Sequence, residues 1–216
     1  FSAVAPRYDL LNHLLSLGID RRWRRDVASS LDLKPSHRVL DLCCGTGDLA
    51  LEIAPRARTF ACDFTWEMLL RAREKSSRAA LPVRLTAADA LRLPYPGECF
   101  DAATVAFGLR NLEDMGAGLR ELRRVLRPRG QLAILEFSHP TQPLLRLPYR
   151  LYLGALLPLI GRLISGREGA YRYLADSIEG FANPGVLCRV LADVGYREIE
   201  FRRLTGGIVA LHRARA

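Results

Sequence analysis

Lysine is almost absent from this chain, although the chain as a whole is strongly basic. Among its 216 residues only Lys34 and Lys75 are lysines, yet the formal net charge at pH 7 is +9. The other cations are arginines, which are spread from Arg7 to Arg215 rather than gathered in one tract. Nucleic-acid-binding modules concentrate their positive charge in a patch or stripe. The spread therefore predicts a solvated surface and no nucleic-acid partner. Salt-dependent binding to RNA is the observation that would favour that alternative.

Cysteines are few and show no paired spacing. They stand at Cys43, Cys44, Cys62, Cys99 and Cys188, an odd number without a CxxC motif. Adjacent cysteines are poorly placed for joint zinc ligation, and the four histidines form no cluster in the sequence, so we expect no metal. The pattern predicts a reduced, cytoplasmic compartment in which the cysteines act as small core residues.

No apolar run is long enough to cross a bilayer. The longest stretch, Leu151–Gly161, is interrupted by Pro158. A transmembrane helix needs about 20 consecutive apolar residues. We therefore expect a segment that lies on a membrane surface or covers a site, and not one that spans a membrane.

Short apolar runs alternate with helical patterns through most of the chain. The predicted strands are 38–43, 59–63, 83–88, 100–107 and 131–137, and the predicted helices between them are 47–54, 66–79 and 114–126. This alternation predicts an α/β fold with a mostly parallel sheet and helices on both faces. The last two strands, 197–204 and 206–214, are too close together for a parallel crossover and should form a C-terminal antiparallel hairpin. We find no repeat or linker, and predict a single domain over residues 1–216.

The first strand leads into a glycine turn, Gly45-Thr46-Gly47, which opens a helix. Glycines let the backbone approach a ligand closely, and the N–H groups at a helix start point toward it. With Ala50 the pattern is G-x-G-x-x-A, which a dinucleotide-dependent oxidoreductase would also have. A simple strand-to-helix connection that needs glycine is the less favoured alternative.

Three acidic residues narrow this choice. Asp41, just before the turn, would repel a pyrophosphate but suits a cationic amino group such as that of S-adenosylmethionine, which carries no phosphate. Asp63 ends the second strand and can accept hydrogen bonds from ribose hydroxyls, and Asp89 follows the third strand, where it can receive an adenine amino group. Each alone is also typical of a helix cap or a turn. Together, at the carboxyl ends of successive strands, they outline one crevice.

The chain closely resembles the ubiquinone/menaquinone biosynthesis C-methyltransferases, which are S-adenosylmethionine-dependent. The motifs that carry the resemblance cover nearly the whole chain and are "RYDLLNHLLSLGIDRRWR", "VLDLCCGTGDL", "FGLRN", "LEFSHP", "YRYLADSIEGF" and "LTGGIVALH". The resemblance implies a Rossmann-like class I methyltransferase fold with seven strands. It also implies cofactor contacts at Thr46, Asp63, Asp89 and Ala90.

The sequence departs from the family pattern at three places, one of which is "FANP" (181–184) where the family usually reads "FPDQ". The family often has a serine directly before "FGLRN", where this chain has Ala106, so only a backbone or packing contact to the cofactor is expected there. The family usually reads "KPGG" before the fifth strand, whereas this chain reads "RPRG" with Arg129 in place of a glycine. That turn must therefore tolerate a side chain.

The implied reaction is methylation of a ring carbon of a prenylated quinol, and the wording "CCGTGDL" favours demethylmenaquinol over a ubiquinone precursor. A ring carbon becomes nucleophilic when the adjacent hydroxyl loses its proton. We expect Arg110 to stabilise that oxyanion, Asn111 to bind the ring oxygen, and Tyr8 to close over the site. His139 is a weaker candidate for the base. Alternatives are a surface salt bridge for Arg110, lid packing for Tyr8, and another small aromatic substrate.

Two segments lie outside the sheet. Residues 1–32 should form an N-terminal helical lid, and residues 141–180 a helical insertion for substrate or membrane contact. Arginines flank the apolar part of the insertion at Arg146, Arg150, Arg162 and Arg167. These features predict peripheral contact with the anionic inner face of the membrane, which would give access to the isoprenoid tail. The alternative is that the insertion packs as a core helix or forms a homodimer interface.

Overall fold

A computed structural model of the chain describes residues 9, 13, 16–152, 154, 176–178, 180–181 and 183–216. The strands are β1 (Arg38–Leu42), β2 (Arg58–Asp63), β3 (Val83–Ala87), β4 (Phe100–Ala106), β5 (Leu126–Phe137), β6 (Arg197–Leu204) and β7 (Val209–Arg215). The helices are α2 (Ile19–Ser30), α3 (Asp48–Ile53), α4 (Trp66–Ala79), α5 (Met115–Val125), α6 (Pro143–Leu151) and α9 (Pro184–Val194). Two 3-10 turns, η2 (Leu109–Asn111) and η4 (Thr205–Gly207), complete the described elements.

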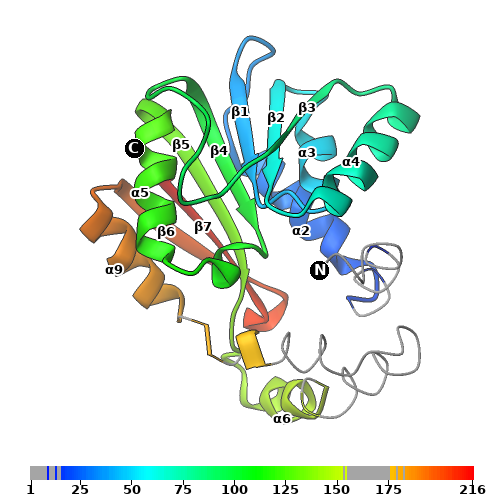
Figure 1. Cartoon of the computed structure of the whole chain (residues 1–216). Helices are drawn as coiled ribbons and strands as arrows, with labels where there is room; N and C mark the ends of the chain where they lie inside the picture. The colour runs from blue at the N-terminus through cyan, green and yellow to red at the C-terminus, as the bar shows by residue number, and fades with distance from the viewer. Residues whose placement is uncertain are drawn as a thin grey trace.

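All seven strands form one sheet with the order β3-β2-β1-β4-β5-β7-β6. Strands β1 to β5 pair in parallel, whereas β7 is antiparallel to both β5 and β6 (Figure 1). The order reverses at β1, where β2 and β4 lie on either side. Ligands bind at such a switch point, outside the carboxyl ends of the strands. The predicted fold, including the C-terminal antiparallel pair, is confirmed.

Two apolar cores lie on opposite faces of the sheet. Leu119 and Leu122 of α5 and Leu187 of α9 pack on one face, together with Leu40 and other strand residues. The residues of the second core come from α2, α3 and the other face of the strands, and include Trp23, Val27, Ile53, Val39 and Ala133. Neighbouring residues of β1 therefore point into different cores, as expected for a parallel sheet that is covered on both faces.

The C-terminal hairpin corrects one predicted boundary. We expected a strand over 206–214, but β7 begins at Val209 and Thr205–Gly207 forms η4. Gly206 and Gly207 have φ values of +66° and +98°, which extended strand residues do not adopt. A β carbon on Gly207 would lie only 3.1 Å from the His139 carbonyl oxygen and 3.1 Å from the Thr141 nitrogen. The turn is thus shaped by close backbone packing that the apolar sequence pattern does not reveal.

The fifth strand is longer than the predicted segment 131–137, because its pairing with β4 begins at Leu126. Arg129, the residue that replaces a glycine of the family, lies inside this extension with a φ of +64°. A non-glycine residue in the left-handed region costs about 1 kcal/mol. The turn accommodates the arginine side chain, as predicted, but keeps the backbone conformation that glycine favours.

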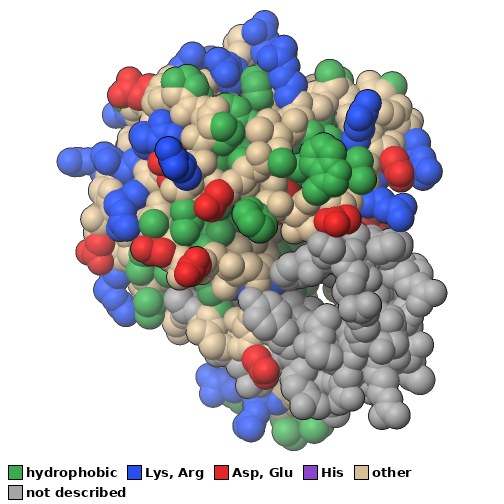
Figure 2. All heavy atoms as spheres, in the orientation of Figure 1, with side chains coloured by type: hydrophobic (Ala, Val, Ile, Leu, Met, Phe, Trp, Pro, Cys, Tyr) green, Lys and Arg blue, Asp and Glu red, His purple; other side chains and the backbone are tan. Residues whose placement is uncertain are grey.

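The two segments outside the sheet are only partly described. The described part of residues 1–32 includes α2, and the described part of 141–180 includes α6; Arg162, Arg167 and Tyr8 lie outside the described residues. Within these described ranges, no helix is long and apolar enough to cross a membrane. Lys and Arg side chains on the face shown in Figure 2 are dispersed among acidic ones and do not gather over a single element.

Candidate functional site

Asp41 occupies the centre of the crevice at the switch point. It lies in β1 between Ala61 of β2 and Thr104 of β4 and is buried. The Thr104 hydroxyl donates a hydrogen bond of 2.7 Å to Oδ1, whereas Oδ2 has no partner among the described residues. Burial raises the pKa of this carboxyl to about 7. An unpaired buried carboxylate oxygen needs a donor, and an ammonium group would supply one.

The glycine turn places backbone amides next to a second carboxylate. Gly45 N and Thr65 N each donate a 2.8 Å hydrogen bond to Asp63, at the end of β2. Gly45 and Gly47 have φ values of +54° and +84°. A β carbon on Gly47 would lie 3.1 Å from the Ala72 β carbon of α4, so glycine permits close packing of α3 on α4.

Thr46 connects the glycine turn to the N-terminal segment. Its buried hydroxyl donates to Asp9 and accepts a 3.1 Å hydrogen bond from Lys75 Nζ. Lys75 also donates to Asp9 over 3.0 Å and forms an ion pair with Asp48 at the start of α3. Lys75 thus joins the turn, α3, α4 and the N-terminal segment through one ammonium group.

The remaining predicted cofactor residues surround the same edge of the sheet. Asp89 follows β3 and accepts a 2.8 Å hydrogen bond from Leu91 N, and Ala90 is buried in the core beside it. Ala106 ends β4 and is partly buried opposite Leu135 of β5. Asp41, the glycine turn, Asp63, Asp89 and Ala106 therefore all lie at or just beyond the carboxyl ends of β1 to β4.

Arg110 is not an exposed salt-bridge residue. Its side chain is 5% exposed, and its Nη1 donates a 2.6 Å hydrogen bond to Oε1 of Glu136, which is 1% exposed. Nη1 also donates to the Phe107 carbonyl, and the guanidinium carbon lies 5.1 Å from the centre of the Phe137 ring. Asn111, next to it in η2, donates from Nδ2 to the same Phe107 carbonyl over 3.5 Å.

Three residues of this region were not among the sequence-based candidates. Glu136 forms an ion pair with Arg110, and Lys75 donates a hydrogen bond to Thr46. Phe64 follows Asp63 directly in the sequence, and its side chain is mostly exposed. An exposed large aromatic beside a predicted ribose-binding carboxylate offers a flat surface for stacking. Phe64 had a local signal in "CDFTW". The partners Glu136 and Lys75 lie 26 and 29 residues away from the residues they contact, and no local sequence pattern indicates these pairings.

One group of described residues has the donor atoms of a metal site. These are His13, Asp20 and Asp48, whose candidate ligand atoms lie within 4.8 Å of one another. Arg24 pairs with Asp20 and lies 3.7 Å from Asp48, and His13 Nδ1 lies 2.8 Å from Asp20. Protein cations already neutralise both carboxylates, so the arrangement is a polar network that links α2 to α3.

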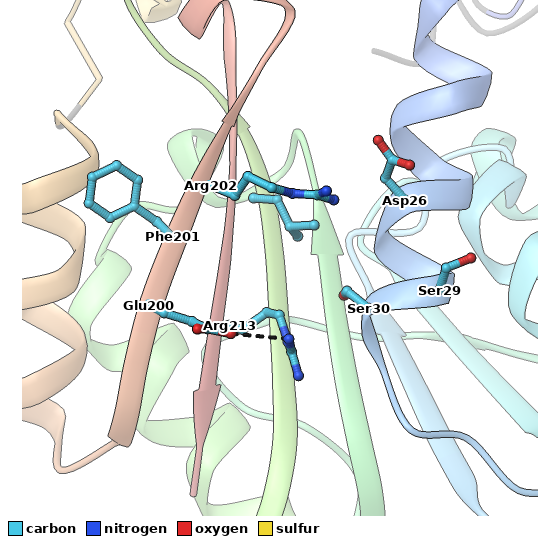
Figure 3. Close-up of a pocket in the computed structure, with 8 residues that line it drawn as sticks. Asp26, Ser29, Ser30, Glu200, Phe201, Arg202 and Arg213 are labelled. Carbon is cyan, nitrogen blue, oxygen red and sulfur yellow. Dashed lines mark ion pairs between the residues drawn. The ribbon is translucent and has the colours of Figure 1, made fainter.

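A groove of about 450 Å³ lies between α2 and the β6–β7 hairpin (Figure 3). Ser29, Ser30 and Asp26 of α2 face Arg202 and Arg213 across it, whereas the Phe201 ring points away toward α9. Glu200 pairs with Arg213 over 3.0 Å, so acidic and basic side chains balance. None of the predicted site residues lines this groove.

The sequence matches a known protein family over its whole length. Residues 1–216 match the model of the ubiE/COQ5 methyltransferase family. The chain belongs to this family. Two predictions are thereby confirmed: that the protein is a methyltransferase, and that its cofactor is S-adenosylmethionine.

Relatives are similar over nearly their whole length. The chain is 48% identical to a demethylmenaquinone methyltransferase of Thermus thermophilus, with 98% of this chain and 97% of the relative covered. It is 47% identical to the ubiquinone/menaquinone biosynthesis C-methyltransferase UbiE of Syntrophotalea carbinolica, over 98% and 90% of the two chains. The crystal structure of a SAM-dependent methyltransferase from Aquifex aeolicus has the same fold, with a TM-score of 0.64, 20% identity, and 89% and 88% coverage.

The residues of the crevice fit S-adenosylmethionine. The unpaired Oδ2 of Asp41 suits its ammonium group, and Asp63 retains lone pairs for the ribose hydroxyls. The crevice contains carboxylates at the place where a dinucleotide would bring its phosphates. Because like charges repel, this arrangement disfavours the alternative of a dinucleotide-dependent oxidoreductase.

Proposed function

We propose that this enzyme transfers a methyl group to a ring carbon of a prenylated quinol, with demethylmenaquinol as the substrate. The observation that carries the proposal is the buried Arg110–Glu136 pair directly after β4 and at the end of β5. It supplies a fixed cation beside the crevice, where a phenolate would develop. The names of the relatives support the menaquinone branch.

The chain's own residues would bind and orient the two reactants. S-adenosylmethionine, when bound, supplies an electrophilic methyl group on a sulfonium. Asp41, the glycine turn and Asp63 would hold it, with Asp89, Ala90 and Ala106 along its adenosine end. Arg110 would stabilise the quinol oxygen as it loses its proton, and Asn111 and Tyr8 would orient the ring. Such donors, fixed in a water-excluded site, contribute several kcal/mol to lowering a barrier.

A methyl-transfer assay tests this proposal. We expect the protein, kept anaerobic with a reductant, to methylate demethylmenaquinol faster than a ubiquinone-type acceptor or a small unprenylated phenol. Arg110→Lys keeps the charge but lacks the planar fork, so turnover should fall at least tenfold while S-adenosylhomocysteine binding is unchanged. Methylation of neither quinol, or tight NADH binding without S-adenosylhomocysteine binding, would contradict the proposal.

We also place the enzyme in the cytoplasm, in peripheral contact with the inner face of the membrane through α6. Leu144, Leu147 and Leu151 are 89%, 65% and 60% exposed along one side of this helix. Arg146 and Arg150 are also exposed, and the helix contains no acidic residue. An apolar stripe edged by arginines is typical of a helix that lies in an anionic leaflet. Flotation with liposomes tests this placement.

Homodimer formation stays a prediction, and native mass spectrometry would test it.

A further inference from the structure

Two polar atoms of the Arg110–Glu136 pair have hydrogen-bonding capacity that the described residues leave unused. The Nε–H of Arg110 is buried and has no acceptor there. Oε1 of Glu136 accepts from the guanidinium and, over 2.9 Å, from Phe137 N, whereas Oε2 accepts only a long 3.4 Å bond from Arg110 N. A buried polar group without a partner costs about 1–3 kcal/mol. This arrangement therefore points to a ligand that supplies both an acceptor and a donor.

A hydroxyl group matches these two atoms. Its oxygen accepts from an N–H group, and its single hydrogen needs one acceptor. Nε and Oε2 belong to the two side chains that the 2.6 Å bond between Nη1 and Oε1 joins. We infer that one small group contacts both atoms. The inference rests on the proposed function, in which the hydroxyl is the quinol hydroxyl adjacent to the methylated carbon.

We propose that Glu136 is the general base and that Arg110 is the counterion shared by Glu136 and the substrate. The quinol O–H bond breaks, the proton moves to Oε2 of Glu136, and the electron pair stays on the quinol oxygen as a phenolate. The negative charge thus moves from protein to substrate while Arg110 remains cationic. The ring carbon then forms a bond to the methyl group while the methyl–sulfur bond breaks and leaves its electron pair on sulfur. Loss of the ring proton to solvent restores the aromatic ring as a phenolate, and the proton on Glu136 returns to the oxygen to give the quinol.

The burial of the pair favours this exchange. Separating or creating charges in a dry site is expensive, but here one cation and one anion are present before and after the proton moves. The other groups that face Glu136 compete little for the proton. Ala210 of β7 lies opposite it, and burial raises the pKa of the nearby Cys43 thiol, which therefore stays neutral.

The test compares Glu136→Gln with wild type across pH. At pH 7 we expect kcat to fall roughly 100-fold or more, because general-base catalysis contributes about 10²–10⁴-fold. Turnover of the variant should then rise about tenfold per pH unit between pH 7 and 9, as the free quinol ionises, while wild type stays flatter. With a quinol that carries an electron-withdrawing substituent, the difference in turnover between wild type and Glu136→Gln should be smaller.

S-Adenosylhomocysteine binding, measured by calorimetry, separates this role from a structural one. We expect the dissociation constant of Glu136→Gln to stay within twofold of wild type, and Glu136→Asp to recover part of the activity and the wild-type pH profile. Glu198 forms an exposed ion pair with Arg129. Glu198→Gln is therefore the matched control, which should leave both turnover and S-adenosylhomocysteine binding unchanged. Unchanged turnover, an unchanged pH slope, or a loss of turnover that follows a loss of ligand binding would each overturn the proposal. If wild type methylates no quinol, the proposed function itself fails.

Discussion

Asp41 places a destabilising charge at the centre of the fold. Its pKa is about 7 in the folded chain, against an ordinary value of 3.8, because burial disfavours the carboxylate. Folding therefore favours the protonated form, and this contribution to stability is complete below about pH 4 and is lost as the pH rises from there through 7. At pH 8 the ionised carboxylate costs up to about 4 kcal/mol, at roughly 1.4 kcal/mol per pKa unit. The cationic end of the cofactor would offset this cost.

We predict that Asp41→Asn raises stability above pH 7 and weakens cofactor binding. Urea unfolding should show the variant more stable than wild type at pH 8, with a difference that shrinks as the pH falls toward about 4. S-Adenosylhomocysteine should bind at least tenfold more weakly at pH 8. Equal stabilities at both pH values would refute the role of the charge.

Asp101 is a matched control for Asp41, because its pKa is shifted in the opposite direction. Burial alone would raise its pKa, but hydrogen bonds from Arg38 N and the Arg127 guanidinium outweigh burial and lower the pKa. Its stabilising contribution is present near neutral pH and is lost as the pH falls through the folded-state pKa. Asp101→Asn should therefore destabilise the protein at pH 8 and have little effect on cofactor binding.

At the scale of elements, α6 is held so that three of its four leucines, Leu144, Leu147 and Leu151, face outward. Leu145 packs against Gly206 of η4, where a β carbon would lie 2.3 Å from Leu145 Cδ1, and Arg146 donates to the Pro140 carbonyl. Tyr149 is buried on the same inner side. Replacing Leu144, Leu147 and Leu151 by serine therefore removes the outer apolar stripe without disturbing these contacts.

We predict that this triple variant no longer floats with liposomes that contain anionic lipid, whereas wild type does. Wild-type binding should weaken at high salt, because Arg146 and Arg150 attract the leaflet electrostatically. Leu70→Ser, at a partly exposed leucine of α4, serves as the control and should float like wild type. Co-flotation of the triple variant at wild-type levels would exclude α6 as the contact.

Elements were predictable where a local pattern determines them. Helix α4 and strand β6 match the predicted ranges 66–79 and 197–204, because their apolar periodicity and flanking residues are local properties. The glycine turn and the three acids also follow from local sequence. Helix η4 and the start of β7 did not follow, because they depend on packing of Gly206 and Gly207 against residues more than 60 positions away.

At the scale of the whole molecule, a polar network joins parts of the chain that the sequence keeps apart. Asp9, Thr46, Asp48 and Lys75 meet at one ammonium group, and Arg24 continues the network toward Asp20. The sequence motifs assign Thr46 to the cofactor and residues 1–32 to a lid, but no local pattern pairs the two. The distance of 66 residues between Asp9 and Lys75 has no local signature.

We predict that Lys75→Met loosens this network and the cofactor turn together. The substitution leaves Asp9 and Asp48 without their shared cation, and these side chains are only partly exposed, so we expect a loss of about 1–2 kcal/mol in the free energy of unfolding. S-Adenosylhomocysteine should bind several-fold more weakly, because Thr46 loses a hydrogen bond, and Lys75→Arg should restore part of both losses. The chain contains one other lysine, Lys34, which is exposed, so Lys34→Met is the matched control for a lost lysine charge. If both methionine variants unfold at the same urea concentration and bind S-adenosylhomocysteine equally, Lys75 does not link the N-terminal segment to the turn.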